Sequence, residues 1–205
     1  DHEHMVKLKK VIGGRSRKLK IKKAKKKSCK DTMVFGIYDK QLAKDLIRLG
    51  FIPGKGKSER CKINFDLIPE EFHSDVFRGL FDADGSLMPY VDKEKSKKGG
   101  ISRIELKGSE ANIKLFIKYI RKFGYEGNGQ TIPKLNKDGQ KIGTQWLVAT
   151  SGDPRCKKII SSLYHNPCES LDRKQINAEI IMSKEIIHRK YDHLGKEFFL
   201  QKKKE

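Results

Sequence analysis

The chain has 205 residues, of which 46 are Lys or Arg and 26 are Asp or Glu, so its formal net charge is +20. Such an excess favours a polyanionic partner. Hydrophobic residues make up 36% of the chain, enough for a packed core. No apolar run is long enough to cross a bilayer, and no secretory or lipidation motif is visible. We therefore expect an intracellular protein, in cytoplasm, nucleoid or organelle, without a membrane partner.

The basic excess is concentrated near the start of the chain, where Lys18, Lys20 and Lys22 alternate with Leu19 and Ile21. This alternation predicts a half-buried strand whose cationic face contacts phosphates. The surrounding pattern predicts a helix, a hairpin and a second helix, over residues 3–12, 18–25 with 31–38, and 40–49.

The segment GLFDADGS, residues 79–86, ends an apolar pattern with helical spacing. The apolar residues Phe72, Val76, Leu80 and Phe81 recur at that spacing. Pro69 with Glu70 and Glu71 supplies a helix start, and Gly85 ends the helix.

Two small residues and two acids occupy the end of this helix. Gly79 and Ala83 are four positions apart and therefore share one face, where a second helix could approach closely. Asp82 and Asp84 lie at the C-terminal end, which the helix dipole makes unfavourable for acids. The pattern therefore indicates a compensating cation.

The region after this helix predicts alternating hairpins and helices. Ser102, Ile104 and Leu106 alternate with polar residues and predict a strand with one buried face. Ser109 is a suitable N-cap for the next helix. The predicted strands are 86–91, 101–107, 130–136 and 142–150, and the predicted helices are 109–124, 154–164 and 171–189. The order from Phe72 onward is αββαββα, an α+β fold class.

The motif and this order together resemble the LAGLIDADG homing endonucleases, which make double-strand breaks in DNA. The resemblance implies that Asp84 binds the catalytic Mg²⁺ (or Mn²⁺), with the Ala83 carbonyl as a second ligand. It implies a basic residue near the cleavage pocket at Lys174, and a polar residue beside the active site at Lys107 or the adjacent glycine. Lys55 or Lys57 would be the counterpart of Lys174 from the first half.

The same resemblance implies a saddle-shaped antiparallel sheet that lies over double-stranded DNA. One face of its strands would reach base edges and phosphates. The residues expected to do so are Tyr90, Arg103, Glu105, Lys107, Lys134 and Gln145, in addition to Lys18, Lys20 and Lys22.

The stretch before residue 66 repeats the later helix, hairpin and helix without a copy of the motif. We therefore expect residues 1–65 to be the C-terminal part of a first pseudo-repeat, residues 66–190 the second unit, and residues 191–205 a basic tail. On this interpretation half of the acid pair is missing. The chain is a fragment, or another polypeptide supplies the segment, or a second subunit of a dimer does.

Two hypotheses about function remain open from the sequence. The first is a metal-dependent homing endonuclease, connected with intron or intein mobility, that hydrolyses phosphodiesters. The second is a non-catalytic binder with the same fold, acting as an RNA maturase or a transcription regulator, since basic faces serve RNA and DNA alike.

Overall fold

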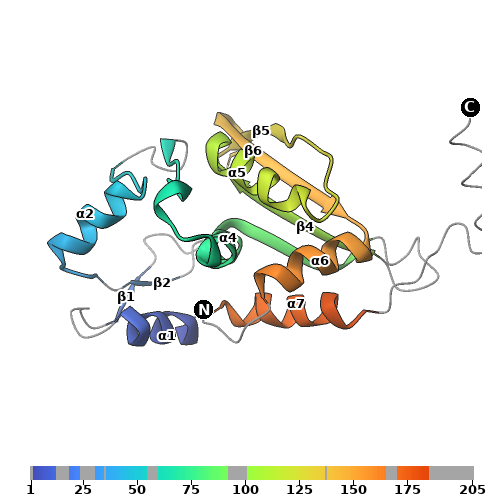
Figure 1. Ribbon diagram of the computed structural model, residues 1–205. Helices are drawn as coiled ribbons and strands as arrows, with labels where there is room; N and C mark the ends of the chain where they lie inside the picture. Colours follow the sequence, from blue (N-terminus) through green and yellow to red (C-terminus); the bar gives the residue numbers. More distant parts are fainter. Residues whose placement is uncertain are drawn as a thin grey trace, which may run out of the picture.

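The computed structural model describes residues 2–12, 19–23, 31–34, 36–54, 60–91, 101–136, 138–164 and 170–184. Their elements form a four-stranded antiparallel sheet with helices, and beside it a smaller group of N-terminal helices and a two-stranded sheet (Figure 1). The α+β fold class expected from the sequence is confirmed.

The N-terminal group consists of α1 (His2–Ile12), β1 (Lys20–Lys22), β2 (Thr32–Val34) and α2 (Lys40–Arg48). Strands β1 and β2 pair antiparallel, and Asp39 caps α2 by accepting from two backbone N–H groups. The expectation of a half-buried strand was wrong for β1, because Ile21 is 62% exposed. A two-stranded sheet has no second layer of its own to cover an apolar face.

The larger group begins with two short 3-10 turns, Phe65–Leu67 and Glu70–Phe72, followed by α4 (His73–Asp84). The elements after it are β3 (Gly85–Val91), β4 (Ile101–Gly108), α5 (Glu110–Arg121), β5 (Gln130–Leu135), β6 (Lys141–Ser151), α6 (Asp153–Leu163) and α7 (Asp172–Ser183). From α4 to α6 this is the αββαββα order that the sequence predicts, and α7 follows it.

The four-stranded sheet has the order β3-β4-β6-β5, so that β3 and β5 form its edges. All pairs are antiparallel, with Ile104 opposite Thr150 and Leu106 opposite Val148. These residues face the helices and are buried. Figure 1 shows α5 and α6 on one side of this sheet, and α4 between the sheet and α2.

The core fills the space between the sheet and helices α4, α5 and α6. Phe116 on α5 lies at its centre, with its ring centroid 5.2 Å from that of Phe77 and 5.1 Å from that of Phe81. These rings hold α4 against the sheet. The buried side of α4 is therefore built on Phe77 and Phe81, whereas Phe72, expected in the apolar pattern, is 52% exposed.

Helix α7 ends earlier than the sequence predicts. The expected end was near residue 189, but Lys184 already has an extended backbone (φ −60°, ψ 133°). At this helix end its side chain donates to Pro89 O on β3 and to Asp153 on α6. None of the described helices has the length and apolar composition needed to cross a membrane.

Candidate functional site

Helix α4 ends at a glycine that the local packing requires. The N–H of Gly85 donates to Phe81 O and closes the helix. A Cβ atom at Gly85 would lie 2.8 Å from that same carbonyl oxygen, closer than real Cβ contacts. The sequence Asp84-Gly85 therefore turns the chain directly from α4 into β3, with both acids at the junction.

The two acids at this junction have different surroundings. Asp82 accepts a hydrogen bond from the Tyr164 hydroxyl at 2.8 Å and another from the backbone N–H of Leu171 at 3.0 Å. It thereby joins α4 to the segment before α7. Asp84 is exposed and borders a cavity. Of the two, Asp84 is the one whose carboxylate is presented outward.

Lys174 lies at the same helix end, but it is buried, with 3% exposure. Its ammonium group donates to the carbonyl oxygens of Phe81, Asp82 and Gly85, the last two at 2.8 Å. Burial lowers the pKa of Lys174, and the charge of nearby Arg173 lowers it further, whereas the carboxylates of Asp82 and Asp84 oppose this shift. The ammonium group thus satisfies carbonyls at the C-terminal end of α4 and offsets the negative end of its dipole.

This position bears on the role expected for Lys174. An ammonium group has three donors, and here three backbone carbonyls accept from it. Such an arrangement favours holding the helix end over activating a water molecule. A catalytic role for Lys174 stays a prediction.

A cavity of about 450 Å³ lies next to Asp84. On one side it is lined by Leu46 and Ile47 of α2, and on the other by Leu80 of α4. Further lining residues are Ala43, Phe51, Ile52, Pro53, Cys61, Leu106, Lys107, Gly108, Ser109, Asn112 and Ile113. Asp84 and Lys107, which the sequence singled out separately, therefore border the same mostly apolar cavity.

The small face predicted on α4 is uncovered in the part of the chain that the structure describes. Gly79 and Ala83 are both exposed, and a Cβ atom at Gly79 would have no neighbour within 4 Å. Leu80 beside them is only partly buried. The face is therefore open to a close approach by another backbone.

The residues expected to contact nucleic acid gather on the face of the sheet opposite the helices. Arg103, Glu105 and Lys107 alternate with the buried residues of β4. The strand register brings Gln145 and Lys134 to the same face. The Arg103 guanidinium forms an ion pair with Glu105 at 2.7 Å, which reduces the net charge of this face.

Other expected contact residues lie elsewhere or outside the description. Tyr90, exposed on β3, has the Lys184 ammonium 4.8 Å from its ring centroid. Lys20 and Lys22 are exposed on β1. Lys18, Lys55 and Lys57 lie outside the described residues. The domain limits of 65 and 190 also stay predictions, and residues 191–205 are not described.

The sequence analysis missed Tyr164, although it fixes Asp82 through a direct hydrogen bond. These residues are 82 positions apart, so spacing carries no signal for the contact. It also missed the ion pair between Lys184 and Asp153, at 2.8 Å. The sequence predicts only that a helix begins next to Asp153, at residue 154.

The described residues contain no group of three or more His, Cys, Asp and Glu side chains that could hold a metal ion. A single protein carboxylate such as that of Asp84 is compatible with a metal site whose other ligands come from outside the described residues, because hard divalent cations bind a protein carboxylate together with phosphate oxygens and water. The remaining ligands would have to come from nucleic acid, solvent and a second acid.

No protein-family model matches the sequence, and no curated protein sequence matches it. The chain is similar to two crystal structures of the homing endonuclease I-CvuI. One, in complex with its target in the presence of calcium, is 18% identical with a TM-score of 0.33, and the similarity covers 58% of this chain and 67% of that chain. The other, with an uncleaved I-CreI target in the presence of magnesium, is 17% identical with a TM-score of 0.30, covering 54% and 66%. The matched part spans about two thirds of each solved chain.

Proposed function

We propose that this chain is part of a DNA endonuclease of the LAGLIDADG homing type, which hydrolyses phosphodiesters with a divalent metal. The observation that carries the proposal is the difference between the surroundings of the two acids at the end of α4. Asp82 is bonded into the fold, whereas Asp84 is exposed and borders the same cavity as Lys107. The GLFDADGS segment and the αββαββα order support the same family.

In this proposal Asp84 and the Ala83 carbonyl hold Mg²⁺ or Mn²⁺. When bound, such an ion lowers the pKa of its water and stabilises charge on the phosphate. Lys107, exposed on the rim of the same cavity, offsets charge on the phosphate oxygens. Lys174 keeps the helix end in place through its three carbonyl contacts.

We call α4, which ends in the GLFDADGS segment, the motif helix. The second carboxylate comes, in this proposal, from a second motif helix that packs against Gly79 and Ala83. The exposed glycine permits that helix to approach closely. The apolar cavity beside Leu80, with the partly exposed α2 side chains Leu46 and Ile47, gives the helix an apolar surface to bury. The segment or second subunit that carries this helix brings the acid opposite Asp84.

The open face of the sheet then lies on double-stranded DNA. Arg103 and Gln145 have side chains suited to guanine and adenine edges, and Lys107 and Lys134 to phosphates. Their common face follows from the strand register. Affinity for DNA should fall steeply with salt, because cationic contacts to phosphates release counterions.

A second candidate function is nucleic-acid binding without cleavage. One observation favours it: the described residues bring a single carboxylate, Asp84, to this site, and no cluster of metal-ligating side chains surrounds it. A maturase or regulator with this fold would need the cationic face and no second acid.

The experiment that separates these functions measures cleavage of a plasmid library in Mg²⁺. The chain is assayed alone and together with a polypeptide that carries a second motif helix. Asp84→Asn should abolish cleavage and preserve DNA binding, while Asp66→Asn, which neutralises an exposed acid in the Phe65–Leu67 turn, should leave both unchanged. Cleavage that survives Asp84→Asn would contradict the site. Tight, metal-independent binding without any cleavage would support the second function.

A further inference from the structure

Strand β3 forms one edge of the four-stranded sheet, and its outward backbone groups have no partner strand among the described residues. In an antiparallel edge strand, alternate residues direct both backbone groups away from the sheet. On β3 these are Gly85 and Leu87, and Pro89 follows at the register irregularity between Met88 and Val91, where its carbonyl oxygen also accepts from Ser102 Oγ of β4 at 3.3 Å. Pro89 has no N–H, and the Gly85 N–H closes α4. The outward row therefore consists mainly of three carbonyl oxygens.

Helix α7 and Lys184, the residue that follows it, place one side-chain donor on each of these carbonyls. Lys174 donates to Gly85 O at 2.8 Å, Asn177 donates to Leu87 O at 3.0 Å, and Lys184 donates to Pro89 O at 2.8 Å. We call these three side chains the edge clamp. Their order along the chain follows the order of the carbonyls, so α7 lies along the strand.

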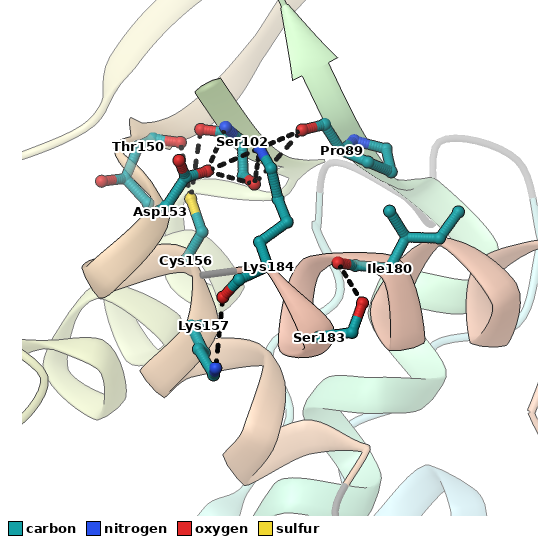
Figure 2. Close-up of polar contacts among 9 residues, drawn as sticks. All are labelled: Pro89, Ser102, Thr150, Asp153, Cys156, Lys157, Ile180, Ser183 and Lys184. Atoms are coloured by element: carbon teal, nitrogen blue, oxygen red, sulfur yellow. Dashed lines mark hydrogen bonds and ion pairs between the residues drawn. The ribbon is translucent and has the colours of Figure 1, made fainter. Parts of the chain in front are cut away.

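The far end of the edge clamp is fixed to two further elements, as Figure 2 shows. The Lys184 ammonium group also contacts Ser102 Oγ of β4 at 3.1 Å and Asp153 Oδ1 of α6 at 2.8 Å. Asp153 itself accepts from the Ser102 hydroxyl at 2.6 Å and from the Ser102 N–H at 2.8 Å. Both members of the ion pair have side chains that are 12% exposed. A buried pair persists when such additional hydrogen bonds satisfy it.

We propose that α7 takes the place of a neighbouring strand on β3 and so prevents this edge from pairing with β3 of a second copy of the chain. Unpaired edges are templates for strand addition, and natural sheets cover them. Here the cover consists of side chains that use the same carbonyls a second strand would need. The proposal concerns the fold and is independent of nuclease activity.

The test compares the wild-type chain with Asn177→Leu, which has a similar shape and no donor, and with Asn177→Leu combined with Lys184→Met. Carbonyl ¹³C chemical shifts along β3 are measured by NMR, because they respond to the hydrogen bonds that each carbonyl oxygen accepts. The carbonyl carbon of Leu87 should shift upfield in the single variant, which lacks the Asn177 donor, and that of Pro89 should shift as well in the double variant. The carbonyl carbons of Ser86 and Met88, which alternate with these residues and pair with β4, should change much less.

Sedimentation supplies the second measurement. The double variant should show a concentration-dependent species larger than any formed by the wild type. Lys158→Met, which removes an exposed lysine from α6, is the charge-matched control and should behave as wild type. An unchanged Leu87 carbonyl shift in the single variant, or a double variant that sediments as wild type does, would overturn the proposal. If the double variant loses its folded spectrum, the shift and the sedimentation of the single variant, which retains both lysines, decide the outcome.

Discussion

The Tyr164 hydroxyl donates to a carboxylate oxygen of Asp82 at 2.8 Å and so joins the end of α6 to the end of the motif helix. The second oxygen of Asp82 accepts from the Leu171 N–H, which leads the chain into α7. Two acids only two positions apart thus separate into one that holds the fold together and one, Asp84, that faces outward.

This separation predicts opposite behaviour for two isosteric variants. Asp82→Asn places an amide donor against the Leu171 N–H or the tyrosine, and should lower the free energy of unfolding by about 1–3 kcal/mol. Asp84→Asn should change it by no more than about 0.5 kcal/mol, because the side chain is exposed. Urea unfolding of both variants checks this. Equal losses of stability would show that Asp82 has no special structural role.

Because Gly79 of the motif helix is exposed, replacing it should raise the stability of the chain and weaken its assembly with a second motif helix. Gly79→Ala should stabilise the chain by about 1 kcal/mol, since alanine favours a helix interior and the added Cβ meets no atom within 4 Å. The same Cβ should weaken binding of a second motif helix. Thermal unfolding of the chain and titration with a motif-helix polypeptide measure the two effects. Stabilisation without any loss of binding would argue against the proposed helix contact.

Lys174→Met should destabilise the chain by about 2–3 kcal/mol, because hydrogen bonds from a charged donor to three backbone carbonyls are lost. Chemical denaturation measures this, with Lys158→Met as the control for charge. A variant as stable as the wild type would mean that the carbonyls find other donors, and would leave Lys174 available for the catalytic role.

Asp153 predicts a dependence of stability on pH. Burial by itself would raise its pKa, but hydrogen bonds from Lys184 and Ser102 outweigh burial, so the pKa lies below its ordinary value of 3.8. A carboxylate whose pKa is lower in the folded than in the unfolded protein stabilises the fold at pH values above the unfolded pKa. This contribution is lost as the pH falls through the folded pKa.

Asp153→Asn should therefore reduce the free energy of unfolding by about 2 kcal/mol at pH 7, and the difference from wild type should narrow below about pH 4. Urea unfolding between pH 7 and pH 3 provides the measurement. Parallel curves for the two proteins over this whole range would contradict the assigned role of the ion pair.

The two cysteines within the described residues should differ in reactivity. Cys156 is fully buried, and burial raises its pKa to about 12, whereas Cys61 is partly exposed. The thiolate is the reacting form, so iodoacetamide at pH 8 should label Cys61 much faster than Cys156. Peptide mass spectrometry after timed labelling distinguishes them. Comparable rates would indicate that the packing around α6 opens readily.

Local pattern predicted most of this fold, because each element is encoded by neighbouring residues. The alternation of Ser102, Ile104 and Leu106 identified β4 and its buried face, and Ser109 was correctly expected to cap α5. The end of α7 could not be predicted, since it depends on contacts from Lys184 to residues 31 to 95 positions away.

The site was predicted in part for the same reason. The motif identified both acids and the small face, but their different surroundings depend on Tyr164 and Leu171, which spacing cannot connect to Asp82. Lys174 was found as a basic residue near the site, yet its burial against backbone carbonyls follows from how α7 packs.

The two lysines of the edge clamp lie at opposite ends of α7, ten positions and about 15 Å of helix apart. One holds the carbonyls next to Asp84, and the other holds the far end of the sheet edge and the start of α6. Any shift of α7 relative to the sheet would therefore break contacts at both ends of β3 at once, including those to the Asp82 and Gly85 carbonyls on either side of Asp84.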